Sequence, residues 1–324
     1  MHKLTQNLIY SLALMLGPSQ AAFSQSLQGA PSRIEIHAVQ SQTLSGPEFL
    51  NGDKGGKPVI LAGELRLPQA RAAKFPAIVL VHGSGGVNGS ADMWIHRLNQ
   101  AGIATFVLDT FSGRGIVSTV QDQTQLNSLA MMVDTYKALD LLAKHPRIDA
   151  SKISVIGFSK GAVASIFSAS TRFQKMYGTD AKFASHIGLY TPCNIRFMGD
   201  TTLTGAPMRF FHGTTDDYVN VVPCRAFVED IKKMGVDVML TEFADTPHGY
   251  DDPLIPALVA LPKAQSVRNC LLVEQSTGNI VNVDTKRSFS ISDPCVAVGV
   301  HVGHNPDATK KTLDAVIAFL QSLK

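Results

Sequence analysis

The chain has 324 residues, of which 45% are hydrophobic and 17% are charged, and its formal net charge is +3. This hydrophobic fraction excludes a disordered or collagen-like chain and is enough for a sizeable core. Runs of Lys and Arg never exceed two residues, so nucleic acid is not expected as a partner. No stretch of 18 apolar residues follows the first thirty, so we expect no membrane span in the mature protein.

The N-terminus has the pattern of a secretory signal peptide. Lys3 precedes a short apolar run at residues 8–16, and small residues follow at positions 19–24. This arrangement is too short for a membrane span and is typical of a cleaved signal. We therefore predict that residues 1–24 are removed and that the protein is exported, to the periplasm or outside the cell. The alternative is a buried N-terminal helix.

Apolar strands then alternate with amphipathic helices along the chain. The expected strands are 34–39, 59–67, 77–81, 104–108, 153–156, 187–190, 208–211 and 236–243. The expected helices are 91–101, 125–143, 162–170, 223–234 and 308–323. This alternation predicts one α/β domain over residues 25–324, with a mostly parallel sheet covered on both faces. Residues 250–305 fit the alternation poorly and are expected to form a long excursion before the last helix.

Ser159 lies in the sequence Gly-Phe-Ser-Lys-Gly, directly after a predicted strand and directly before a predicted helix. This is the G-x-S-x-G nucleophile motif in the strand-turn-helix context that it requires. A sharp turn there projects the hydroxyl above the sheet, and the helix N-terminus favours developing negative charge. Ser159 is therefore the candidate nucleophile, whereas the bland alternative is an ordinary strand-to-helix turn.

A serine nucleophile needs a base and an acid, and both follow in the order Ser, Asp, His. Asp216 follows the strand at 208–211, and His248 follows the strand at 236–243. The carboxyl ends of parallel strands share one edge of the sheet, so the three side chains can meet there. Asp217 competes with Asp216, but adjacent residues leaving a strand point in different directions, and we favour Asp216.

Other histidines fit the role of base less well. His82 belongs to a different loop, and His212 precedes the acid by too little to reach around it. His301 and His304 have a spacing seen in metal sites, but no carboxylate cluster accompanies them. We therefore expect neither a metal nor a cofactor.

A glycine-rich loop, His-Gly-Ser-Gly-Gly, begins at His82 and follows an apolar strand. Such a loop supplies one backbone N–H of an oxyanion hole, and the residue after the nucleophile supplies the other. The candidates are the amides of Ser84 and Lys160, although a plain turn at residues 82–86 is the alternative.

Together these motifs resemble the dienelactone hydrolase-like group of α/β-hydrolases, over roughly residues 57–249 and the last helix. The resemblance implies the α/β-hydrolase fold and the same oxyanion pair. Typical members carry Cys as the nucleophile and Glu in the first loop, where this chain has Ser159 and Gly83. That difference argues against dienelactone itself as the substrate. Arg114 is a candidate for binding a substrate carboxylate, with a structural salt bridge as the alternative.

Four cysteines are present, and an even number in an exported chain suggests disulfides. Their dispersal argues against zinc. Three pairings are possible in principle. The order of elements in this fold favours Cys193 with Cys224 near the active-site edge, and Cys270 with Cys295 within the excursion.

The sequence thus predicts an exported serine hydrolase that acts on a small ester or lactone. A peptidase or amidase would use the same three residues. A non-catalytic binding protein on the same fold is the third hypothesis, but such chains usually lose a member of the triad. Neither the acyl group, the alcohol nor the oligomeric state follows from the sequence.

Overall fold

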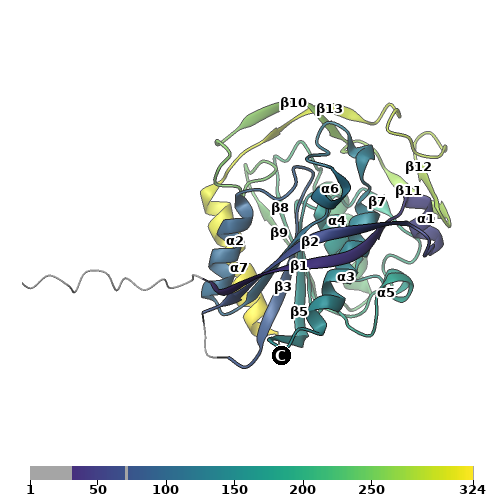
Figure 1. Ribbon diagram of the computed structural model, residues 1–324. Coiled ribbons are helices and arrows are strands. Elements are labelled where there is room, and N and C mark those ends of the chain that lie inside the picture. Colours follow the sequence, from purple (N-terminus) through teal and green to yellow (C-terminus); the bar gives the residue numbers. More distant parts are fainter. Residues whose placement is uncertain (1–30, 70–71, 324) are drawn as a thin grey trace, which may run out of the picture.

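The computed structural model describes residues 31–69 and 72–323, so the predicted signal peptide at 1–24 lies outside the described residues. An eight-stranded sheet runs through the centre of the molecule (Figure 1). Its strands, in spatial order, are β1 (Pro31–Thr43), β2 (Lys57–Pro68), β4 (Ala104–Asp109), β3 (Phe75–Val81), β5 (Ile148–Phe158), β6 (His186–Leu189), β8 (Met208–Gly213) and β9 (Val238–Phe243). The strands from β4 to β9 are parallel to one another, and β1 and β2 pair antiparallel at one edge. This confirms the predicted α/β-hydrolase fold class.

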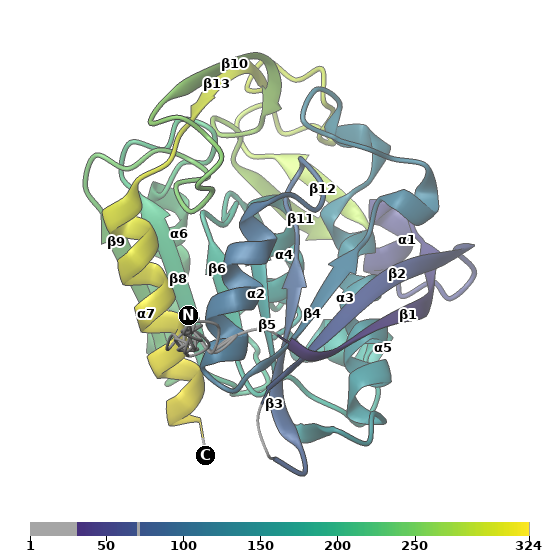
Figure 2. The same cartoon turned by 60° about the vertical axis from the view of Figure 1, so that its left-hand side comes forward.

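Helices cover both faces of the sheet, as the alternation predicted (Figure 2). One face carries α2 (Ser90–Gln100) and α7 (Pro306–Ser322), whose Trp94 and Val316 are fully buried against it. The other face carries α3 (Ser128–Ala143), α4 (Lys160–Phe167), α5 (Thr171–Tyr177) and α6 (Val222–Lys233). The short elements are α1 (Gly46–Asn51), η1 (Ser112–Arg114) and η2 (Gln123–Gln125). Among the described residues, no helix has the length and apolarity to cross a membrane.

Residues 250–305 arch over the carboxyl ends of the parallel strands, and we call them the cap segment (Figure 1). Strands β10 (Val259–Ser266) and β13 (Ala297–Val302) form an antiparallel ribbon. Strands β11 (Leu272–Ser276) and β12 (Asn279–Asn282) form a hairpin that pairs with β7 (Ile195–Arg196). The two ends of the cap segment meet, because Gly303 N donates to His248 O over 3.0 Å and Asn305 N to Tyr250 O over 2.9 Å.

Two disulfides have the pairing expected from the order of the elements. Cys193, in the loop after β6, is joined to Cys224 at the start of α6. Cys270 is joined to Cys295 within the cap segment. Each bridge therefore ties one local region, and no cysteine of the chain is free.

The buried His186 on β6 predicts a loss of stability in mild acid. Its Nδ1 lies 2.8 Å from Ser165 O, and burial lowers the pKa of His186 to about 4. Unfolding releases the ring to an ordinary histidine pKa of about 6.5. The stability is fully present above about pH 6.5 and declines as the pH falls towards 4, because only the unfolded state gains the proton. The shift corresponds to about 3 kcal/mol.

We expect His186→Asn, which retains a donor for Ser165 O, to remove this part of the pH dependence. Urea unfolding at pH 7.5 and pH 4.5 measures the effect. The matched control is His96→Asn, since His96 is exposed on α2 and its replacement should leave the slope unchanged. Parallel slopes for the wild type and His186→Asn would contradict the prediction.

Candidate active site

Ser159 occupies a strained turn between β5 and α4. Its backbone has φ 51° and ψ −116°, a conformation that side chains rarely adopt. A Cβ on Gly157 would lie 2.3 Å from Gly161 O, and a Cβ on Gly161 would lie 2.2 Å from Val81 O. The turn therefore requires glycine at both positions, which explains the spacing of the motif.

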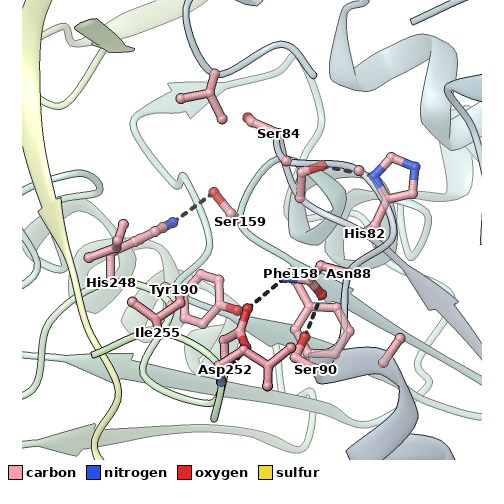
Figure 3. A pocket seen from close by; sticks show the side chains of 18 of the residues that line it. His82, Ser84, Asn88, Ser90, Phe158, Ser159, Tyr190, His248, Asp252 and Ile255 are labelled. Carbon is pink, nitrogen blue, oxygen red and sulfur yellow. Dashed lines mark hydrogen bonds between the residues drawn. The ribbon is translucent and has the colours of Figure 1, made fainter. Parts of the chain in front are cut away.

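The structure brings Ser159, His248 and Asp216 into one hydrogen-bonded chain (Figure 3 shows the serine and the histidine). His248 Nε2 lies 3.0 Å from Ser159 Oγ, and His248 Nδ1 lies 2.7 Å from Asp216 Oδ2. All three side chains are buried. With Nδ1–H directed at the carboxylate, the lone pair of Nε2 faces the serine hydroxyl, as a general base requires.

The carboxylate of Asp216 is held in its charged form. Its Oδ1 accepts hydrogen bonds from the amides of Tyr218 at 2.9 Å and Val219 at 2.8 Å. Burial by itself raises the pKa of Asp216, but the electrostatic interaction with His248 and the hydrogen bonds from His212 and His248 outweigh it. The pKa of Asp216 is therefore well below the ordinary aspartate value. His212 was rejected as the base, and its ring instead lies 3.3 Å from this carboxylate.

Asp217 points away from the triad. Its carboxylate accepts from the backbone N of His301 at 2.7 Å and from the ring Nδ1 of His301 at 2.8 Å. Of the two adjacent acids, only Asp216 contacts His248, because the turn sends the next side chain towards the cap segment. Asp217 thus fastens β13 to the loop that carries the acid.

The expected oxyanion donors, Ser84 and Lys160, line a pocket together with Ser159. Lys160 is the first residue of α4, and Ser84 lies in the loop after β3. Among the described residues, neither backbone N–H donates to a protein acceptor. His82 fixes this loop, since its Nδ1 lies 2.8 Å from Gly83 O and its Nε2 accepts from Thr110 N at 3.2 Å. Burial lowers the pKa of His82, so the ring is neutral there.

A polar network behind the oxyanion loop was not predicted from the sequence. Lys160 Nζ donates to Thr119 Oγ1 at 3.0 Å, Gln123 Oε1 at 3.0 Å and Gln123 O at 3.2 Å. Gln123 in turn contacts the hydroxyl of Ser84, with Nε2 and Oγ 3.1 Å apart. The side chain of Lys160 thus supports the loop that carries Ser84. Burial lowers the pKa of the Lys160 amine to about 7.

The comparisons with known proteins place the chain in a family. Residues 61–272 match the model of the dienelactone hydrolase family. The chain belongs to this family. Membership of the family makes the protein a hydrolase. A search of curated proteins found no match to the sequence.

Two solved structures share the fold of this dienelactone hydrolase family member. One is a dienelactone hydrolase-like promiscuous phosphotriesterase from metagenomic libraries, with 16% identity and a TM-score of 0.55 over 90% of this chain and 98% of that chain. The other, from Klebsiella pneumoniae, is provisionally described as a dienelactone hydrolase. It has 11% identity and a TM-score of 0.54, over 89% of this chain and 99% of that chain. At these identities the likeness shows the fold alone.

Arg114 of this dienelactone hydrolase family member lies outside the site. Its guanidinium forms an ion pair with the fully buried Asp134, with NH1 and Oδ2 2.8 Å apart. It also donates to Thr43 Oγ1 and Thr110 O, both at 2.7 Å. Of the two roles considered for Arg114, the structure shows the salt bridge and not a contact with the site. The sequence could not distinguish them because the partner acid lies on α3, 20 residues away.

Two tyrosines flank the ring of His248, and no motif in the sequence indicates them. The rings of Tyr190 and Tyr218 have centroids 4.4 Å and 4.8 Å from that of His248. Tyr190 has a positive φ of 39° and donates through its hydroxyl to the buried Asp251 at 2.7 Å. These contacts hold the imidazole in place. The positive φ at Tyr190, directly after β6, has no signature in the sequence.

Three residues of the kinds that bind metal ions lie together away from the active site, two on β1 and one after α3. Ligand atoms of Glu35, His37 and His145 lie within 4.8 Å of one another. However, His145 Nδ1 accepts from Arg147 N at 3.2 Å, so its Nε2 carries the proton and donates to Glu35. That nitrogen therefore has no lone pair for a metal.

Proposed function

We propose that the protein is an exported serine hydrolase that cleaves a carboxylic ester or lactone through an acyl-enzyme. The hydrogen-bonded chain from Ser159 through His248 to Asp216 carries this proposal. A serine hydroxyl becomes an effective nucleophile only when such a base is in place. The neighbouring backbone amides of Ser84 and Lys160 support it as donors to an oxyanion.

These groups supply each step of the proposed reaction. His248 Nε2 takes the proton of Ser159 as Oγ attacks the carbonyl carbon, and the amides of Ser84 and Lys160 stabilise the oxyanion. The protonated imidazole then gives its proton to the leaving alcohol oxygen, which leaves an acyl ester on Ser159. Water attacks this ester with His248 as the base, and the acid and free serine are released. Asp216 stabilises the imidazolium throughout.

A screen of p-nitrophenyl esters, lactones and amides tests the proposal, with Ser159→Ala as the blank. A fluorophosphonate probe should label Ser159 in the wild type. Turnover of amides without turnover of esters would favour the peptidase alternative, and a protein that neither labels nor turns over would be a binding module.

Export rests on the N-terminal sequence and on the two disulfides, which form in oxidising compartments. Fractionation of cells that express the full chain tests it, with N-terminal sequencing of the product. The expected N-terminus lies near residue 25. Recovery of the intact chain from the cytoplasm would contradict export.

The two disulfides should differ in their effect on activity. In the chain-entropy model, loops of 31 and 25 residues correspond to about 3 to 4 kcal/mol of stability each. Cys193→Ser/Cys224→Ser should lower both stability and kcat, because Cys224 lies in the first turn of α6, the helix after the loop of Asp216. Cys270→Ser/Cys295→Ser should change KM and the relative rates among esters more than kcat. Urea unfolding and steady-state kinetics measure both, and unchanged kinetics in the second variant would contradict a role for the cap segment.

A further inference from the structure

Two cavities meet at the nucleophile. The first has a volume of about 400 Å³ and is the one seen in Figure 3, between the oxyanion loop, Tyr190 and Ile255. The second has a volume of about 360 Å³ and extends towards α3 and β11. Ser84, Ser159 and Tyr218 line both cavities, so the serine lies where they meet. Each volume is within the range of a small-molecule pocket.

The cap segment contributes walls to both cavities. In the first cavity these walls include Ile255, Val259, Leu261 and Val302. In the second they include Leu272, Ile280, Phe289 and Ile291, which face Val163 and Phe197 from the other side. The cap segment therefore shapes the space on each side of the reacting carbonyl.

The position of His248 distinguishes the two cavities chemically. His248 lines the first cavity but is not among the residues that line the second, whereas Lys160 lines only the second. The histidine must reach the leaving oxygen to protonate it, so the alcohol has to lie on its side. The water that later attacks the acyl-enzyme must reach the same nitrogen. The acyl group consequently extends into the second cavity.

Several polar side chains of the second cavity already bind other protein groups. The three acceptors described above surround Lys160 Nζ, and Gln265 Oε1 accepts from Gln123 N at 2.9 Å. Asn194 Nδ2 donates to Val267 O at 2.9 Å and to Cys270 O at 3.0 Å. An acyl chain there meets mainly aliphatic and aromatic side chains. The lining also includes Arg268, whose Nη1 donates to Asp217 O and to Gly299 O.

We propose that the second cavity binds an apolar acyl chain and that the first binds the alcohol. The substrate class is thus an ester with a substantial apolar group on each side of the carbonyl. This inference rests on the proposed function and adds to it the orientation and the size of the substrate.

Filling each cavity separately tests the assignment. Ile291→Trp fills the second cavity and Val259→Trp the first, and both residues are only half-buried, so the substitutions should fold. Acid release at constant pH is followed for methyl hexanoate, hexyl acetate and methyl acetate. We expect Ile291→Trp to lower kcat/KM for methyl hexanoate by on the order of 10- to 100-fold relative to the other two esters. Val259→Trp should do the same for hexyl acetate only.

Methyl acetate serves as the reference for folding and chemistry, with Ile291→Phe as a milder variant. If the wild type hydrolyses methyl acetate through Ser159 but the two tryptophan variants lose the same substrate, or exchange their preferences, the assignment of the cavities is overturned. If no ester is hydrolysed and a fluorophosphonate does not label Ser159, the proposed function itself is overturned, and the inference with it.

Discussion

Replacing Ser159 by alanine should lower kcat by roughly 10³- to 10⁶-fold while leaving the fold intact. The hydroxyl is the group that attacks the carbonyl, and its removal leaves only binding and the oxyanion donors. Single-turnover kinetics on an activated ester measures the loss, and urea unfolding verifies that the variant is folded.

His248→Ala should cost a similar factor, because members of a triad act as a unit. The double variant Ser159→Ala/His248→Ala should then be scarcely slower than either single variant. Near-wild-type turnover by Ser159→Ala would contradict the assignment of the nucleophile, and additive losses would argue that the two residues act separately.

Replacing Asp216 by asparagine should lower kcat by about 10⁴-fold. The carboxylate accepts the Nδ1–H of His248 over 2.7 Å, and its charge favours the imidazolium that forms during the reaction. An asparagine can direct its amide N–H at Nδ1, which favours the wrong tautomer of the ring.

Asp217→Asn is the matched control, because it changes the same charge one residue away. Asp217 contacts His301 in the cap segment and not His248, so its replacement should reduce kcat less than about tenfold. Steady-state kinetics on one ester compares the two variants. The reverse ranking would move the acid to position 217.

The sequence predicted most of the strands and helices that position the site, with differences of up to a few residues at their ends. For example, the predicted strand 77–81 became Phe75–Val81, and the predicted helix 308–323 became Pro306–Ser322. Such segments can be predicted because each has a local pattern. Strands in the centre of the sheet are continuous apolar runs, and the helices that cover the sheet are amphipathic. The order Ser159, Asp216, His248 was also readable, because parallel strands bring their carboxyl ends to one edge.

The strands of the cap segment and the hydrogen-bond network of Lys160, Gln123 and Ser84 could not be predicted from the sequence in the same way. Strand β10 has only two buried residues and pairs with β13 more than 30 residues later, so no local pattern marks it. Likewise, the contacts of Gln123 with Ser84 and Lys160 join residues 39 and 37 positions apart. Contacts of this kind depend on tertiary packing, which a single sequence does not encode in its local periodicity.

The cap segment leaves the sheet directly after His248 and returns beside it, where Gly303 N bonds to His248 O. Its hydrogen bonds to residues around the site include those of Asp251, Gln265 and His301, near its two ends and on β10 and β13. The part between β10 and β13 can therefore vary without moving any strand that carries the triad. Insertions, deletions and exchanges in this part of the chain would alter what enters the cavities while the bond-breaking groups stay in place. With this arrangement, substrate selectivity can evolve separately from reactivity. Protein engineers could exchange this one stretch between family members to change selectivity while the triad stays as it is.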